Sequence, residues 1–319
     1  MRFFLLLVGM LLSVGSAASA ADGTPARPNI IFIVADDMGP WAWGGGGDPQ
    51  ALTPHLDRLA REGARLDHCY SPTPVCSPSR VAVLVSRYGT EVGITDWINP
   101  KSEPAVGLDP KYPAWPTFLK QAGYRTAMIG KWHLGTEDRF LPKHFGYDHF
   151  VGHRSSPLEL RDPLLDVDNH TERRSGFVAD VFTDAAIRFV RKDLHQPFAI
   201  SLHFREPHRP WLPLSIEDYK PFEKLDSALP QPQHPLLDVA QVKKIMPEYL
   251  AAIACIDRNV GRLLAVLDQD KIADNTLFIF TSDHGYNVGH HGILHKGNGE
   301  WILTTIPPST NPNIPAKRA

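Results

Sequence analysis

The sequence predicts an α/β protein in which helices flank a mostly parallel central sheet. One observation is four short runs of β-branched and aromatic residues, the pattern of strands buried on both faces. These runs are residues 30–34, 126–129, 198–204 and 277–280. The other is that polar residues with catalytic or ligand chemistry follow the carboxyl end of each run, as expected of an open α/β sheet.

Helices are predicted between these strands. Thr53 and Pro54 are typical of a helix start, which predicts a helix over residues 53–61. Longer helices are expected over residues 177–191 and 246–267. In the last, apolar residues recur at helical spacing and form a core-facing stripe, made of Leu250, Ile253, Val260, Leu264 and Leu267.

The overall composition excludes a strongly basic protein. The chain has 319 residues, 43% of them hydrophobic, and a formal net charge of −2. This supplies enough apolar material for a large core but no positive field that would attract nucleic acid in bulk. We therefore expect no nucleic-acid partner, and any anion selectivity must come from a local site.

The amino terminus has the pattern of a secretory signal peptide. Arg2 precedes the apolar run 3–12, and the small residues at 18–20 form a cleavage site. This run is shorter than the ~20 apolar residues that span a bilayer. We expect a signal peptide over residues 1–20, a secreted or periplasmic mature protein, and no stable membrane insertion after cleavage.

Polar residues that could bind a ligand follow each of the predicted strands. Because parallel strands end at the same edge of a sheet, these side chains are expected to lie close together. They are Asp36 and Asp37 after the first run, Lys131 and His133 after the second, His208 after the third, and Asp283 and His284 after the fourth.

The most informative segment is Cys76-Ser77-Pro78-Ser79-Arg80. Pro78 stands where a helix could begin, and apolar residues 81–85 follow it. Residue 76 is therefore expected at a helix N-terminus, where backbone N–H groups and the helix dipole favour an anion. The chain has only 3 cysteines, too few and too scattered to suggest a disulfide framework.

This segment resembles the maturation motif of the formylglycine-dependent (type I) sulfatases, which belong to the alkaline phosphatase superfamily. The resemblance extends over residues 28–300, and its supporting segments occur in the family's order. They are residues 53–63, 130–135, 207–210 and 281–285. The resemblance implies an alkaline phosphatase-like sulfatase core over residues 21–300.

In that family a separate maturation enzyme, the formylglycine-generating enzyme, oxidises the cysteine to an aldehyde. The resemblance implies that Cys76 becomes formylglycine, whose hydrate attacks sulfur through one hydroxyl and expels sulfate when the other is deprotonated. It assigns the remaining catalytic roles as follows: Arg80 holds the formylglycine oxygens, Lys131 and Lys296 contact the sulfate, His133 takes the proton, and His208 is the acid near the leaving oxygen. Of these, Lys131, His208 and Lys296 are also the expected substrate-binding residues.

The resemblance also implies a Ca²⁺ site. Its expected ligands are Asp36, Asp37, Asp283, His284 and the modified Cys76, and such an oxygen-rich set suits a hard cation. Many family members have asparagine where this chain has His284. Because imidazole is a softer ligand, Mg²⁺ or another divalent ion remains an alternative.

The resemblance weakens beyond residue 300. Family members continue into a smaller C-terminal subdomain, whereas residues 301–319 contain several prolines and end soon after. We expect these residues to form an irregular tail at a truncation point, with the C-terminal subdomain missing.

The predicted activity is that of a sulfuric ester hydrolase acting on aryl or carbohydrate sulfate esters. The alternatives are a phosphomonoester, phosphodiester or phosphonate hydrolase of the same superfamily with an unmodified nucleophile, or an inactive remnant. The sequence does not identify the substrate. Tryptophans that could stack on a substrate ring or simply pack in the core are Trp41, Trp43, Trp97 and Trp132.

Overall fold

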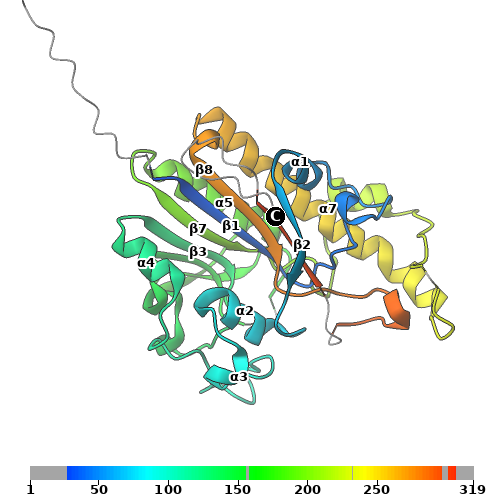
Figure 1. Cartoon of the computed structure of the whole chain (residues 1–319), viewed down its shortest axis with the longest axis horizontal. Helices are drawn as coiled ribbons and strands as arrows, with labels where there is room; N and C mark the ends of the chain where they lie inside the picture. The colour runs from blue at the N-terminus through cyan, green and yellow to red at the C-terminus, as the bar shows by residue number, and fades with distance from the viewer. Residues whose placement is uncertain (1–26, 156–157, 232, 297–300, 307–319) are drawn as a thin grey trace, which may run out of the picture.

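The computed structural model describes residues 27–155, 158–231, 233–296 and 301–306. Within these residues a 9-stranded sheet forms the centre of the molecule, in the order β2-β9-β8-β1-β7-β3-β4-β5-β6 (Figure 1). Neighbouring strands from β8 to β4 are parallel, and the outer strands on both sides are antiparallel. This confirms the predicted α/β class with its mostly parallel sheet.

The strands predicted from apolar runs form the middle of the sheet. They are β1 (Asn29–Ala35), β3 (Arg125–Lys131), β7 (Phe198–His203) and β8 (Thr276–Ser282). They pair in parallel in the order β8-β1-β7-β3, so their carboxyl ends meet at one edge. The residues that follow these strands are thereby brought together.

Outer strands extend the sheet on both sides. They are β4 (His149–His153), β5 (Leu164–Val167) and β6 (His170–Arg173) on one side, and β2 (Ala64–Tyr70) and β9 (Trp301–Ile306) on the other.

The expectation of an irregular tail from residue 301 is wrong for its first part. Residues 301–306 form β9, which lies between β2 and β8 and pairs antiparallel with both. The backbone at 301–306 finds hydrogen-bonding partners on both sides, which favours a strand over irregular structure. The predicted signal peptide and residues 307–319 lie outside the described residues.

Helices cover both faces of the sheet because successive strand residues point to opposite sides. Ala127 and Ile129 of β3 belong to the larger core, which also contains α1 (Pro54–Glu62), α5 (Val178–Lys192) and α7 (Val239–Gln269). Met128, between them, belongs to a second core with α2 (Cys76–Val85). The remaining helices are α3 (Gly89–Val92), α4 (Trp115–Gln121), α6 (Ile216–Tyr219), and the 3₁₀ turns η1 (Gly44–Gly46), η2 (Asp138–Phe140), η3 (Pro142–Phe145), η4 (Lys220–Phe222), η5 (Ala273–Asn275) and η6 (His290–Gly292).

The three predicted helices are present as α1, α5 and α7. Helix α7 begins at Val239, earlier than expected, because the Asp238 side chain caps it by accepting a hydrogen bond from the backbone N–H of Gln241 at 3.0 Å. Among the described residues, none of the helices combines the length and the apolar character needed to cross a membrane.

Candidate functional site

The N-terminus of α2 carries Cys76, which contacts residues that follow the carboxyl ends of β1 and β8 (Figure 1). Cys76 is the first helical residue, after an extended Val75. Pro78 occupies the first turn, where its missing N–H would have no helical partner in any case. Both Cys76 and Arg80 are buried. Residue 76 therefore lies where backbone N–H groups and the helix dipole favour an anion.

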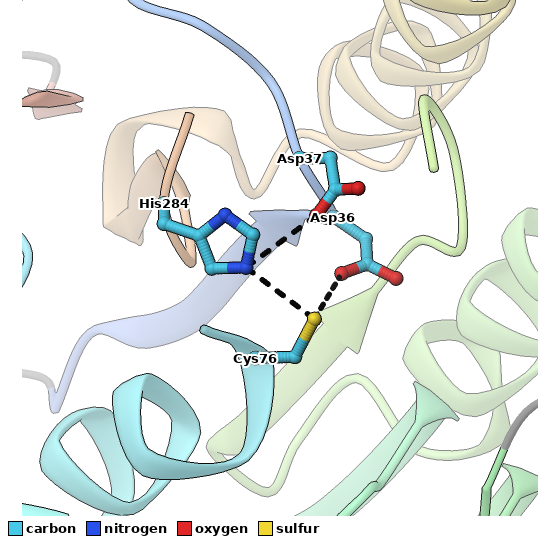
Figure 2. Close-up of side chains that lie close together, drawn as sticks. All are labelled: Asp36, Asp37, Cys76 and His284. Carbon is cyan, nitrogen blue, oxygen red and sulfur yellow. Dashed lines mark hydrogen bonds and ion pairs between the residues drawn. The ribbon is translucent and has the colours of Figure 1, made fainter. Parts of the chain in front are cut away.

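The ends of β1 and β8 bring acidic and imidazole groups to this helix terminus. Asp36, Asp37, Cys76 and His284 each offer a ligand atom within 4.8 Å of the others, and all are buried. Figure 2 shows these side chains pointing toward one another. Sγ of Cys76 lies 3.6 Å from Oδ1 of Asp36, and Nε2 of His284 lies 3.4 Å from Oδ1 of Asp37. We call these four residues the ligand group.

Asp283 adjoins the ligand group but is engaged elsewhere. Its Oδ1 atom accepts hydrogen bonds from the backbone N–H groups of Asp37 at 3.1 Å and His284 at 2.9 Å. Its Oδ2 atom accepts from Nη2 of Arg80 at 3.0 Å. These bonds hold the β1 and β8 loops and the arginine in register, and the role of Asp283 as a metal ligand stays a prediction.

Two of the predicted anion-binding cations are buried beneath the ligand group. Nζ of Lys131 lies 2.5 Å from Oδ2 of Asp36, and Nη2 of Arg80 lies 3.4 Å from Oδ1 of the same residue. Nη1 of Arg80 also donates to the carbonyl oxygen of Lys131 at 3.0 Å. Burial and these opposite charges fix both cations in place.

Lys296, the third predicted cation, contacts the ligand group at Asp37 and Cys76. Its Nζ atom donates to Oδ1 of Asp37 at 2.7 Å and lies 3.2 Å from Sγ of Cys76. Burial would lower the pKa of this lysine, but the charge of Asp37 raises it above its ordinary value. The cation therefore stays protonated next to the sulfur atom.

The two predicted catalytic histidines lie around this centre in different settings. His133 is 4% exposed, and its Nδ1 atom has no hydrogen-bonding partner among the described residues. Burial lowers the pKa of His133 well below its ordinary value. Nε2 of His208 lies 3.8 Å from Oδ2 of Asp37, and burial lowers the pKa of His208 to about 4. Both rings are neutral at pH 7 in the site as described.

Burial and opposite charges together set the protonation of the residues in the site. Burial alone would raise the pKa of Asp36, but Lys131 and the other cations hold it well below its usual range. Burial would lower the pKa of His284, whereas Asp283 and its neighbours raise it to about 10. Asp36 is thus ionised and His284 is protonated. Two carboxylates and an imidazole that converge in this way fit a divalent cation, which would take over the charge now supplied by the proton.

Sequence reasoning missed two residues that position this site. His203, at the end of β7, has its Nδ1 atom 3.2 Å from Nη1 of Arg80, and its strand-end location was the available signal. The hydroxyl of Tyr249 accepts from Gly39 N–H at 2.8 Å and donates to the Asp37 carbonyl at 2.9 Å. It thereby supports Asp37 in its left-handed backbone conformation, φ 73°. Tyr249 lies inside a long apolar helix pattern, which gives no sign of this role.

Sequence relatives of this chain are sulfatases. It is 29% identical to an N-acetylglucosamine-6-O-sulfatase of Bacteroides thetaiotaomicron, over 92% of this chain and 64% of the relative. It is 30% identical to the human N-acetylgalactosamine-6-sulfatase, over 83% of this chain and 51% of the relative. The chain thus spans between half and two thirds of the length of these relatives.

Solved structures share the fold. One was determined in complex with its substrate D-glucosamine-2-N,6-O-disulfate, and it matches with a TM-score of 0.74 at 26% identity, over 88% of this chain and 71% of that one. A phosphonate monoester hydrolase of Agrobacterium radiobacter matches with a TM-score of 0.61 at 18% identity, over 89% and 68%, which shows the fold alone. The family model described as "Sulfatase" matches residues 28–307. On this match over most of its length, the chain belongs to the sulfatase family.

Proposed function

We propose that this chain carries the catalytic site of a hydrolase for sulfate monoesters of carbohydrates, with a nucleophile made by oxidation of Cys76. The observation that carries the proposal is the surroundings of Cys76. Its sulfur lies at a helix N-terminus, 3.2 Å from Nζ of Lys296, with Lys131 and Arg80 on the acidic group beside it. A sulfate group at this point would meet positive charge from several directions. Carbohydrate esters are favoured over aryl esters because the relatives named above act on sulfated sugars.

The aldehyde form of residue 76 would supply, once hydrated, one hydroxyl to attack sulfur and a second whose deprotonation releases sulfate. Forming it requires a maturation enzyme that oxidises the thiol. The buried surroundings are prepared for the oxygens of this residue, since Arg80 and the first turn of α2 both offer N–H donors. Replacing sulfur by oxygen also makes the ligand group harder, which favours Ca²⁺ over softer ions.

The remaining site residues either supply positive charge to the sulfate or transfer protons. Lys131 and Lys296 neutralise the sulfate oxygens. His133, held neutral by burial, is ready to accept the proton of the second hydroxyl. His208 lies on the more open side, with 26% of its side chain exposed. The negative charge of a bound sulfate would raise its pKa above the value of about 4 that burial sets, so that the ring takes up a proton and donates it to the leaving oxygen.

A divalent cation in the ligand group would supply positive charge for a sulfate oxygen and for the oxygens of residue 76. Asp36, Asp37, His284 and the matured residue 76 would hold it. Asp283, whose Oδ1 atom lies 3.7 Å from Nε2 of His284, would have to turn from its present hydrogen bonds to join them. We also propose that the chain is exported, because of the signal pattern in residues 1–20.

The proposal is tested by producing the chain with and without a formylglycine-generating enzyme. Mass spectrometry of the peptide that contains Cys76 should show loss of the thiol only in the co-expressed protein. Hydrolysis of 6-sulfated N-acetylglucosamine should follow the fraction converted, and Cys76→Ala should be folded but inactive. Cys76→Ser should take up at most one sulfuryl group and stop, because a serine lacks the second hydroxyl.

Three outcomes would contradict the proposal. Activity with an intact thiol would overturn the aldehyde nucleophile. Hydrolysis of a phosphonate or phosphate ester in preference to every sulfate ester would assign the site to the other branch of the superfamily. A chain that neither melts cooperatively nor cleaves any of these esters would be an inactive remnant.

A further inference from the structure

A short segment, residues 94–98, adjoins the residues next to the nucleophile. The backbone N–H of Ile98 donates to Oγ of Ser77 at 3.0 Å. The carbonyl oxygen of Ile98 lies 3.3 Å from Nε2 of His133. Ile98 is thus bonded both to the neighbour of Cys76 and to the predicted catalytic base. We call residues 94–98 the rim segment.

The rim segment is held at both ends and open between them. Ile94 and Ile98 are each 3% exposed, and Ile94 N–H donates to the Gly89 carbonyl at 2.8 Å. The residues between the isoleucines, Thr95, Asp96 and Trp97, are exposed. The backbone N–H of Trp97 donates to Oδ1 of Asp96 at 2.7 Å. These contacts fix the backbone of the exposed residues directly before Ile98, which is bonded to Ser77 and His133.

Trp97 differs from the other tryptophans considered as ring platforms. Trp43 and Trp132 are 1% and 2% exposed, so they belong to the core. Trp41 packs against Tyr249 and His290, with ring centroids 5.6 Å and 4.3 Å apart. Trp97 is 46% exposed, and within the described part of the chain it stacks on no other aromatic ring.

We propose that Trp97 is the surface on which the pyranose ring of the sulfate ester stacks. This inference rests on the proposed function, because the sulfate held at Cys76 is what brings the sugar to the rim segment. Trp97 directly precedes Ile98, the residue bonded to Ser77 and His133. The Cα atoms of Trp97 and Ile98 are therefore about 4 Å apart. The apolar C–H face of a pyranose matches the flat indole, which loses little side-chain entropy on binding.

The neighbours of Trp97 favour a sugar over a plain aryl group. Thr95 and Asp96, the exposed residues that precede Trp97 in the chain, carry a hydroxyl and a carboxylate that can hydrogen-bond to ring hydroxyl groups. An unsubstituted aryl sulfate offers no such partners. The rim segment therefore combines the apolar surface and the polar groups that a small carbohydrate site requires.

The inference is tested by binding to the unmatured chain, whose Cys76 thiol prevents turnover. Calorimetry would compare 6-sulfated N-acetylglucosamine with inorganic sulfate, which occupies the anion site without a ring. Trp97→Ala should weaken binding of the sugar sulfate about tenfold, leave inorganic sulfate unchanged, and be largely rescued by Trp97→Phe. Phe118→Ala, which removes a 58% exposed aromatic from α4, is the matched control and should change neither affinity.

Each contrary outcome is distinct. If Trp97→Ala binds the sugar sulfate as tightly as wild type does, Trp97 is not the stacking surface. The same conclusion follows if the wild-type chain binds the sugar sulfate no more tightly than inorganic sulfate. An equal loss for both ligands would mean that Trp97 supports the anion site instead of the sugar. Failure of the matured chain to hydrolyse sulfate esters, with the binding pattern intact, would count against the proposed function and leave the Trp97 site standing.

Discussion

Nε2 of His284 lies 3.3 Å from Sγ of Cys76, so the second residue after β8 is in direct contact with the first residue of α2. The same nitrogen lies 3.4 Å from Oδ1 of Asp37. His284 therefore belongs at once to the ligand group and to the surroundings of the nucleophile. Its protonated state, with the pKa raised to about 10 by the nearby carboxylates against the effect of burial, supplies charge that a metal ion would otherwise provide.

Replacing His284 by asparagine should change how metal affinity depends on pH. A metal ion must displace the proton of His284, because only the neutral imidazole is a ligand. At any pH where His284 is protonated in the metal-free protein, the wild-type affinity should therefore rise with pH, by up to about tenfold per pH unit. His284→Asn should flatten this slope and favour Ca²⁺ over Mn²⁺, since the amide offers an oxygen. Calorimetric titrations of matured protein at about pH 6 and about pH 8 measure both effects, and equal slopes would exclude His284 as a ligand.

Replacing His208 by alanine should matter most for poor leaving groups. A sugar alkoxide needs a proton as it departs, whereas a nitrophenolate does not, so only the first depends on the acid. His208→Ala should lower kcat for a sugar sulfate by about 10²-fold or more and for nitrophenyl sulfate by much less. His144→Ala, at an exposed histidine on η3, is the control. Equal losses on both substrates would show that His208 binds the sulfate and does not act as the acid.

The sequence was most informative where burial alone decides structure. Strands β1, β3, β7 and β8 are apolar on both faces, and their pattern predicted them within a few residues. Strand β2 was missed because its residues are mostly exposed and form no continuous apolar run, and it is defined by pairing with the distant β9. Such long-range pairing leaves no local pattern to read.

The residues of the site also divide into those that the local sequence predicts and those that depend on the rest of the folded chain. Asp36 and Asp37 follow β1, and Lys131 is the last residue of β3, so the topology of the sheet brings them together. Lys296 was identified only through the family resemblance, because it follows no strand. Trp97 was visible as a tryptophan, but its exposure depends on the buried isoleucines around it, which only the folded chain reveals.

Lys131 can keep its position only because the preceding residue, Gly130, has no side chain. The φ of Gly130 is 105°, and a Cβ atom there would lie 1.9 Å from the carbonyl oxygen of His203 on β7. Gly130→Ala should push β3 away from β7, displace Lys131, and abolish most activity. Gly47→Ala is the matched control, because Gly47 has φ 107° with nothing within 4 Å of the added Cβ. It should cost only about 1 kcal/mol of backbone strain.

Denaturant unfolding separates these two effects. Gly130→Ala should lower the free energy of unfolding by several kcal/mol, since the clash is with a backbone carbonyl that cannot move without breaking strand pairing. Equal destabilisation of the two variants would mean that only backbone conformation matters at Gly130. If Gly130→Ala retained sulfatase activity, the role of Lys131 would not depend on the pairing of β3 with β7.

Glu206 should make the stability of the protein fall as the pH rises. It is 3% exposed, its Oε2 atom has no hydrogen-bonding partner among the described residues, and burial raises its pKa from 4.5 to about 7 despite Arg205. The folded state thus holds this proton where the unfolded state releases it, so stability is full below pH 4.5 and declines until about pH 7. The difference corresponds to about 3 kcal/mol.

Glu206→Gln should remove this decline with pH and melt at a higher temperature than wild type at about pH 8. The control Glu223→Gln, at an exposed ion pair with Lys220, should do neither. If the melting temperatures of wild type and Glu206→Gln change with pH in the same way between pH 5 and pH 8, Glu206 is ionised in the folded protein.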